Sequence, residues 1–558
     1  MAHKVTSQGF FERCAWAECL FASHPTRRAL LGLKSAWVCR EVTVRVHRNH
    51  SFEHVISAAG AWAAYAGIRM SWADVPYDDA LSMQGLGEQP DLEVIWYDVE
   101  AVQSALGDEV TGWLLSRAQA LRKLSNAPIL LVVIGLEESA EQVLRKQTCV
   151  VPGLRLAPTA QLLAGIANPF DDRLRRLSGS RLCETSNLML AKELACRWLP
   201  AILAPRLKAV IVDLDQTLYE GVLGEDGFQV RLSAGHAGLQ SALKSLMTSG
   251  VFLGLVSRNT REDVEALFAA RADFPLKLGD FSAVEIGWGS KSDAIRRACV
   301  QLRIDPSAIV FIDDNPGELL EVAAHLPQVG LIHAAPDAEQ TCRNLDFFPG
   351  IWTWGVSPTD LVRVADLNAE TERKNLEILA ADKMAYLREL RPNLEIWIRP
   401  LALRDRLHEL SNKTNQFNLN LSRLDEVAVH GYLHHPGKFA ITVGLSDRLT
   451  DSGIVAAMFG SVIGDEITVE EWVISCRALG RELEGLMAAS ALRALAPGAK
   501  VASFHYKSGP RNSPGRDWLA KASGQALEAE GSVSIMLSTL PVIADLPIGL
   551  STHRNERP

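Results

Sequence analysis

The stretch VIVDLDQTL, residues 210–218, joins a run of apolar residues to two aspartates, Asp213 and Asp215. A short, continuous apolar run rich in valine and isoleucine is typical of a buried strand in a parallel sheet. Residues two apart on a strand face the same side, so the two carboxylates are expected to converge just beyond the strand end. The stretch therefore predicts a functional carboxylate pair in an α/β fold, with two solvated aspartates as the alternative.

Polar residues also end two of the following elements. Ser257 and Asn259 close the apolar run VFLGLVSRN, and Lys291 begins a helix in GSKSDA. Asp313 and Asp314 close a third apolar run, AIVFIDDN. The carboxyl ends of parallel strands lie at one edge of an open sheet, where such folds place their ligands. We therefore expect these side chains to gather around the aspartate pair.

The gathered residue types suit phosphoryl transfer. This reaction needs positioning and charge neutralisation of a phosphoryl group more than elaborate covalent chemistry. Magnesium prefers carboxylate oxygens, and a lysine with a hydroxyl can hold phosphate oxygens. One carboxylate can attack phosphorus while its neighbour protonates the leaving oxygen.

The four pieces, in this order, resemble the haloacid dehalogenase (HAD) superfamily of phosphotransferases. The resemblance implies that Asp213 is the nucleophile and Asp215 the general acid and base. It also implies that Ser257, Asn259 and Lys291 bind the phosphorylated substrate. The Mg²⁺ ligands it implies are Asp213, Asp215, Asp313 and Asp314. A degenerate site that binds without catalysis is the alternative.

A closer resemblance comes from DLDQTLYEGVLGEDG, residues 213–227. It is similar to the FkbH-like branch of that superfamily (subfamily IIIC), whose members read DLDNTLWGGVLGEDG. The segments KTNQFNLN, ISCRALGRELE and VFIDDNPGE also resemble FkbH-like segments, so the likeness covers about residues 170–540. Two departures from the pattern matter, Gln216 in place of Asn and Glu220 in place of Gly.

The FkbH-like resemblance implies a reaction on an acyl phosphate of the 1,3-bisphosphoglycerate type. Phosphate is removed, and the glyceryl group passes through an enzyme thioester to an acyl carrier protein in polyketide or related biosynthesis. Two other hypotheses stay open. One is a Mg²⁺-dependent phosphatase of a small phosphorylated metabolite, and the other is a scaffold that has lost its chemistry.

The segment from Arg477 to Gly480 resembles the acyl-CoA loop of GNAT acyltransferases. Cys476 comes directly before it and is the candidate for the acyl thioester, because a thiol at a helix N-terminus can have a lowered pKa. A small, buried structural cysteine is the alternative. Lys413 and Asn415, in KTNQFN, are candidate contacts for a polar acyl group or a pantetheine arm, or else part of a loop that satisfies its own backbone.

The whole chain, 558 residues with 47% hydrophobic residues, is too long for one core. Shifts in composition predict an N-terminal α/β domain (residues 1–204), a HAD-like phosphatase domain (205–350), a connector helix (351–391) and a C-terminal domain (392–558). The expected fold is a HAD-type, Rossmann-like parallel sheet. An SGNH-hydrolase-like α/β domain without catalytic function precedes it, and a GNAT-like α+β domain follows it.

The net charge of −9 gives no overall attraction to nucleic acid or to anionic lipid. Nine scattered cysteines and the absence of a signal-like or membrane-spanning segment favour a cytoplasmic enzyme. The expected partners are an acyl carrier protein and a small phosphorylated acyl substrate.

Overall fold

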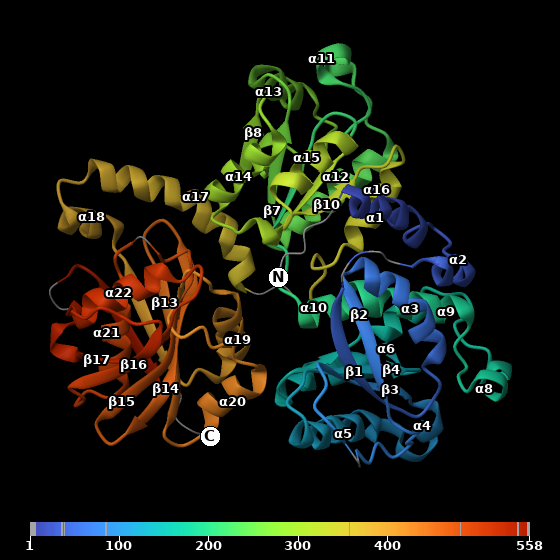
Figure 1. Cartoon of the computed structure of the whole chain (residues 1–558), viewed down its shortest axis with the longest axis horizontal. Coiled ribbons are helices and arrows are strands. Elements are labelled where there is room, and N and C mark those ends of the chain that lie inside the picture. Colours follow the sequence, from blue (N-terminus) through green and yellow to red (C-terminus); the bar gives the residue numbers. More distant parts are fainter. Residues whose placement is uncertain are drawn as a thin grey trace. The chain divides into compact units, whose positions relative to one another are not determined.

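The structure is a computed structural model that describes residues 7–34, 37, 39–83, 86–355, 358–479, 481–543 and 546–554. The chain forms two compact units, Met1–Val356 and Ser357–Pro558 (Figure 1). Gly480, one of the residues expected to bind substrate, lies outside the described residues. None of the described helices is both long and apolar enough to cross a bilayer.

The first sheet of unit 1 is parallel, with strand order β2-β1-β3-β4-β5. Its strands are β1 (Arg40–Arg48), β2 (Ile68–Asp74), β3 (Leu92–Asp98), β4 (Ile129–Ile134) and β5 (Leu154–Leu156). Every residue of β3 and β4 is buried because helices cover both faces of the sheet. Val94 and Val132 pack on one face, and Tyr97 and Val133 pack on the other.

The helices around the first sheet are likewise divided between its two faces. Those on the first face include α1 (Ser7–Leu20), α2 (Arg27–Gly32), α3 (Glu53–Tyr65) and α9 (Glu184–Glu193). Those on the second face are α5 (Val110–Leu124) and α6 (Glu138–Gln147). The remaining helices are α4 (Glu100–Leu106), α7 (Thr159–Ala164), α8 (Asp172–Ser178) and α10 (Leu199–Leu203).

The second sheet of unit 1 is also parallel, with strand order β10-β9-β6-β7-β8. Its strands are β6 (Ala209–Val212), β7 (Phe252–Ser257), β8 (Ala283–Ile286), β9 (Ile309–Asp313) and β10 (Gly330–His333). Its helices are α11 (Leu223–Asp226), α12 (Ala234–Thr248), α13 (Arg261–Ala270), α14 (Lys291–Leu302), α15 (Pro316–His325) and α16 (Ala338–Asp346). The chain runs outward from β6 to β8, then returns to the other side of β6 for β9 and β10. The strand order therefore reverses between β6 and β9.

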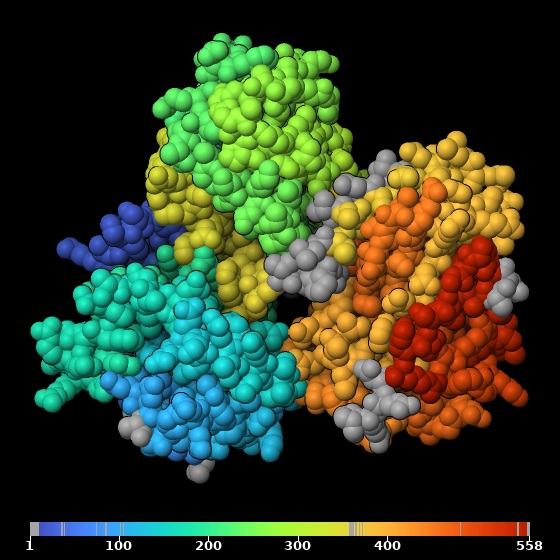
Figure 2. All heavy atoms as spheres, turned by 180° about the vertical axis from the view of Figure 1, so that it is seen from behind, coloured from blue at the N-terminus to red at the C-terminus, as the bar shows by residue number. Residues whose placement is uncertain are grey.

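Helix α1 also packs against the second sheet's part of unit 1. Phe21, just after α1, stacks on Phe347 with 5.7 Å between ring centroids. In the space-filling view the blue N-terminal residues lie against yellow residues that belong to the second sheet's part of unit 1 (Figure 2). The N-terminal helix therefore joins the two sheets of unit 1 into one packed body.

Unit 2 contains one mixed sheet, with strand order β17-β16-β15-β14-β13-β11-β18. Its strands are β11 (Asn393–Ile398), β12 (Phe417–Asn418), β13 (Lys438–Ser446), β14 (Asp451–Ile463), β15 (Glu466–Ile474), β16 (Val501–Lys507), β17 (Glu530–Met536) and β18 (Gly549–Arg554). Its helices are α17 (Pro358–Leu379), α18 (Lys383–Leu390), α19 (Arg404–Lys413), α20 (Glu426–His434), α21 (Glu484–Leu495) and α22 (Ser513–Ser523). Strands β11, β13, β14 and β15 are antiparallel neighbours, whereas β15 and β16 are parallel.

The segment expected to be one connector helix is divided into α17 and α18. Helix α17 is fixed to the sheet of unit 2 by a buried ion pair, because Arg373 Nε lies 2.8 Å from Asp447 Oδ2. Helices α17 and α18 therefore belong to unit 2, whereas the start of the expected connector belongs to unit 1.

The C-terminal tail forms a strand of the sheet. Strand β18 pairs in parallel with β11 from Gly549 to Arg554. This pairing explains the order, because it satisfies the backbone groups along one edge of β11.

Candidate active site

The candidate active site lies where the strand order of the second sheet reverses. Asp213 directly follows β6, and Asp313 ends the adjacent strand β9. Ser257 ends β7 on the other side of β6. In open α/β sheets ligands bind outside the carboxyl ends of the strands, at the point where the strand order reverses. The structure thus brings the sequence-predicted residues of three strands to one edge.

Lys291 is the centre of the charged cluster. Its Nζ lies 2.8 Å from Asp213 Oδ1 and 2.5 Å from Asp313 Oδ2. All three side chains are almost fully buried. Lys291 is the first residue of α14, whose N-cap Ser290 accepts a hydrogen bond from the Asp293 backbone N–H. The helix start therefore holds the ammonium group between the two carboxylates.

A group of three carboxylates fits a divalent cation. Asp213, Asp313 and Asp314 each offer an oxygen, and these oxygens lie within 4.8 Å of one another. Hard divalent cations favour such an oxygen-donor set. The hydroxyl of Thr217 is buried four residues beyond Asp213 and has no hydrogen-bond partner in the structure. An unpaired buried hydroxyl at this edge is consistent with a site that is completed by a ligand.

The electrostatics of this group favour protons or a cation. Burial raises the pKa of Asp213 to about 7, and the nearby charge of Asp313 adds to this rise while Lys291 opposes it. Burial also raises the pKa of Asp313 and of Asp314. Burial alone would lower the pKa of Lys291, but Asp213 and Asp313 outweigh it and raise this pKa. The positive charge of Lys291 therefore does not compensate the negative charge of the three carboxylates, whereas an added cation would.

Asp215 accepts hydrogen bonds on both carboxylate oxygens. Its Oδ1 accepts from the Tyr219 hydroxyl at 2.6 Å and the Leu223 backbone N–H at 2.8 Å. Its Oδ2 accepts from Asn259 Nδ2 at 2.8 Å. The sequence predicts four aspartate ligands, and the structure groups the side chains of Asp213, Asp313 and Asp314. Asp215 stays a predicted ligand.

Asn259 links Asp215 to the expected phosphate-binding serine. Its Nδ2 donates to Asp215 Oδ2 and also to Ser257 Oγ, at 3.0 Å. Tyr219, whose hydroxyl donates to Asp215, is not among the residues predicted from the sequence. Its position four residues after Asp215, in the turn following the strand, was the available signal. Together these residues fix the orientation of Asp215.

The two departures from the FkbH-like pattern have local explanations. Gln216 has a φ of 55°, a left-handed conformation that Asn adopts more readily than Gln. The conformation at this position explains why Asn is the commoner residue. Glu220 forms an ion pair with Arg231, and its backbone pairs with Arg231 in a short bridge. Its negative charge is therefore matched locally.

The sequence does not predict two further contacts at this edge, one ion pair and one hydrogen bond. Arg258 Nη1 lies 2.7 Å from Glu318 Oε1, which joins the loop after β7 to α15. Ser292 donates its hydroxyl to Glu321 Oε1 at 2.5 Å, which joins α14 to the same helix. These contacts support Lys291 from its neighbours. Nothing in the sequence spacing indicates such long-range pairs.

The sequence predicts that Cys476 lies at a helix N-terminus, but the structure places it elsewhere. It is half-buried in a turn after β15, and α21 begins only at Glu484. The sequence between them breaks the helix because Glu482 has a φ of 54°. The argument that a helix dipole activates this thiol is therefore removed.

The expected acyl-CoA loop, which starts at Arg477, also differs from a phosphate cradle. Arg481 turns into the interior of unit 2, where Nη2 lies 3.3 Å from Asp366 Oδ1 and Nη1 3.4 Å from Asp447 Oδ2. A loop that cradles a pyrophosphate presents backbone N–H groups at the start of a helix. Here α21 starts only at Glu484, so the described part of this segment does not begin a helix, and Arg477 and Gly480 remain predicted substrate contacts.

The amides of KTNQFN serve mainly the fold. Asn418 Nδ2 donates to the carbonyl groups of Ser411 and Thr414. Asn415 is exposed and accepts a hydrogen bond from Arg423, while Lys413 Nζ lies 3.1 Å from Glu409 Oε1. The interpretation of this stretch as a loop that satisfies its own backbone thus agrees with these contacts. Lys413 and Asn415 remain predicted substrate contacts.

No protein-family model matches the chain, and no curated protein matches it either. One similar solved structure is the N-terminal part of the protein BF1531 from Bacteroides fragilis, described as containing a phosphatase domain complexed with Mg. It is 17% identical, with a TM-score of 0.45, and the match covers 60% of this chain and 99% of that chain. At this level of similarity, function has to be argued from the site itself.

Proposed function

We propose that the chain is a Mg²⁺-dependent phosphatase or phosphotransferase of the HAD type, with its active site in residues 205–350. The observation that carries this proposal is the buried group of Asp213, Asp313 and Asp314 around Lys291, at the point where the strand order reverses. Buried carboxylates with raised pKa values at a sheet edge are costly for stability, so their retention indicates function.

The chain's own residues supply the parts of the reaction. An Asp213 oxygen attacks phosphorus, the bond from phosphorus to the leaving oxygen breaks, and Asp215 gives that oxygen a proton. Water then attacks the phosphorylated Asp213, and Asp215 takes the proton of this water. Tyr219 and Asn259 hold Asp215 for both steps. Ser257 and Lys291 bind phosphate oxygens.

Asp213, Asp313 and Asp314 would hold the cation. When bound, Mg²⁺ supplies positive charge that offsets the charge of the phosphoryl group. The lysine alone cannot provide this compensation, as the raised pKa of Asp213 indicates.

For the substrate, we propose an acyl phosphate of the 1,3-bisphosphoglycerate type, with transfer of the glyceryl group to an acyl carrier protein. The FkbH-like segments support this choice. A GNAT-like fold for unit 2 is supported by four antiparallel strands followed by a parallel neighbour. In this reaction a thiolate attacks the acyl carbon, the bond from that carbon to the oxygen of the 1-phosphate breaks, inorganic phosphate leaves, and a thioester forms. Asp213 and Asp215 act on the other phosphate, the 3-phosphate ester, by the steps given above. Cys476 remains the proposed thiol.

The phosphoryl site is tested with Asp213→Asn. Phosphate release from a generic phosphate ester in Mg²⁺ should fall by about 10³-fold or more, because the nucleophile is removed. Asp293→Asn is the matched control, since Asp293 is an exposed aspartate at the start of α14. Unchanged, Mg²⁺-dependent release by Asp213→Asn would show that the nucleophile is elsewhere.

Acyl transfer is tested by the intact mass of the protein after incubation with 1,3-bisphosphoglycerate. A covalent glyceryl adduct that is lost in Cys476→Ala would support transfer through this thiol. Cys299→Ala is the control, because Cys299 is a buried cysteine in unit 1. Phosphate release without any adduct would leave a phosphatase that does not transfer an acyl group.

A further inference from the structure

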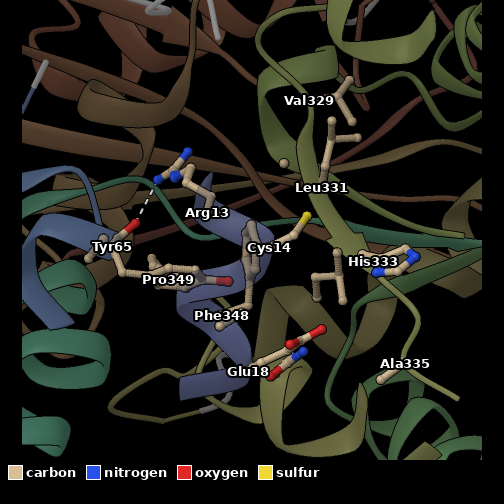
Figure 3. Close-up of a pocket in the computed structure, with 15 residues that line it drawn as sticks. Arg13, Cys14, Glu18, Tyr65, Val329, Leu331, His333, Ala335, Phe348 and Pro349 are labelled. Atoms are coloured by element: carbon tan, nitrogen blue, oxygen red, sulfur yellow. Dashed lines mark hydrogen bonds between the residues drawn. The ribbon is translucent and has the colours of Figure 1, made fainter. Parts of the chain in front are cut away.

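A separate cavity of about 140 Å³ lies in unit 1, between helix α1 and strand β10. Arg13, Cys14 and Glu18 line it from α1, and Leu331 and His333 line it from β10 (Figure 3). Phe348 lies between these two walls. None of the residues assigned to the phosphoryl site lines this cavity.

Arg13 is the only arginine or lysine in the lining. Its Nη2 donates to the backbone carbonyl of Tyr65 at 2.6 Å, the bond drawn in Figure 3. The rings of Trp37 and Tyr65 lie 5.5 Å and 5.7 Å from the guanidinium carbon. Among the residues that the structure describes, no carboxylate is within ion-pair distance of Arg13.

This arrangement leaves most of the charge on Arg13 uncompensated. A guanidinium has five N–H donors, and a carboxylate can accept two of them in parallel. Burial lowers the pKa of Arg13, and the groups that oppose this shift are Tyr65 and two cysteines rather than an acid. An anionic group in the cavity would supply the missing partner.

The rest of the lining combines apolar and polar residues. Apolar side chains come from Ala17, Ala66, Val329, Leu331, Ile332, Phe348 and Pro349, and polar ones from Glu18, His333 and Asn344. An apolar cavity of about 150 Å³ can hold benzene, which has six heavy atoms. The cavity volume therefore fits a ligand of about six to eight heavy atoms with an apolar portion.

We propose that this cavity is a binding site for a short-chain organic carboxylate, with the carboxylate at Arg13 and the hydrocarbon chain between α1 and β10. A carboxylate with four to six carbons has the required size and charge. None of its lining residues is assigned a role in the phosphoryl chemistry, and the two sites are joined by His333, whose Nε2 lies 2.9 Å from the backbone carbonyl oxygen of Asp314.

The test measures the direct binding of butanoate and hexanoate to the full chain. Ligand-observed NMR and the rise in Tm are the two readouts. Saturable binding is expected for the wild type. Arg13→Gln should weaken it about tenfold or more, because a charge-assisted hydrogen-bond pair is lost. Arg28→Gln is the matched control, since Arg28 is exposed on α2 and does not line the cavity.

A second variant covers the case in which Arg13→Gln does not fold. Cys14→Leu fills the cavity from α1 and leaves the charge in place, so it should also abolish binding. Butanamide and inorganic phosphate complete the set of probes, and both should bind at least tenfold more weakly than butanoate.

Three results would overturn the proposal. One is the absence of saturable binding of either carboxylate to the wild type. Another is equal binding by Arg13→Gln, or by Cys14→Leu if Arg13→Gln does not fold. The third is binding of butanamide or phosphate as tight as that of butanoate, which would indicate a simple apolar gap or an inorganic-anion site.

Discussion

Replacing Asp213 by Asn should make the metal-free protein more stable at pH 8 while abolishing phosphate release. Asp213 is buried, and its pKa is raised from 3.8 to about 7. Between these values the folded protein holds a proton that the unfolded chain has released. Raising the pH through this window therefore lowers the free energy of unfolding, and the loss is complete above pH 7.

The magnitude follows from the size of that window. Each pKa unit corresponds to about 1.36 kcal/mol, so the window gives an upper value of about 4 kcal/mol. Asp213 shares Lys291 with Asp313, so part of this value belongs to the pair. We expect Asp213→Asn to gain about 2–4 kcal/mol at pH 8 and less than half of that gain at pH 5.

The assay is urea denaturation of the wild type and the variant in EDTA at pH 8 and pH 5, with a parallel series in Mg²⁺. The metal should stabilise the wild type more than Asp213→Asn, because it binds the ionised carboxylate. Asp293→Asn is the control, since hydrogen bonds from Ser290 and Arg296 lower the pKa of Asp293. Asp293→Asn should show no gain in the free energy of unfolding at pH 8.

The reasoning is refuted if Asp213→Asn is no more stable than the wild type in EDTA at pH 8. An equal gain in the free energy of unfolding at pH 5 would also contradict the reasoning. At pH 5 most of the wild-type protein should carry a protonated Asp213, so most of the cost of burying its charge should already be gone.

Three further predictions concern single side chains. Lys291→Met removes one partner of a buried ion pair, so the metal-free protein should lose roughly 3–5 kcal/mol, measured by denaturation in EDTA, and Mg²⁺ should recover part of it. Glu471→Ala removes the acceptor of three backbone N–H groups, those of Asn420, Ser422 and Trp472. It should cost roughly 2–4 kcal/mol, seen as a lower Tm for unit 2. Trp288 is 75% exposed three residues before Lys291, so Trp288→Ala should change stability by less than about 0.5 kcal/mol and should raise KM for a phosphate ester in steady-state kinetics.

The apolar runs with polar ends were the most informative feature of the sequence. They located β6, β7 and β9, and the end of each run placed Asp213, Ser257 and Asp313 at one edge. This success has a physical basis, because strands buried on both faces must be continuously apolar. Strands β8 and β10 were not predicted from the sequence. They are the two edge strands of this sheet, and most of their residues are only half-buried, so neither has a long, continuous apolar run.

The parts of the site that were not predicted depend on contacts between distant residues. The hydrogen bonds to Asp215 come from Tyr219, Leu223 and Asn259, whose positions depend on the turn after β6 and on the end of β7. The start of α21 was also misplaced, because the amphipathic pattern continues through residues 476–483. A positive φ at Glu482 interrupts the helix there, and periodicity does not reveal it.

The pairing of β18 with β11 has a consequence for the synthesis of the chain. Strand β11 is the first strand of unit 2, whereas β18 lies among the last described residues. While the ribosome makes everything between them, one side of β11 has no neighbour to pair with. An unpaired strand edge invites association with other nascent chains. Shortening the gene by the codons for β18 would make that temporary exposure permanent.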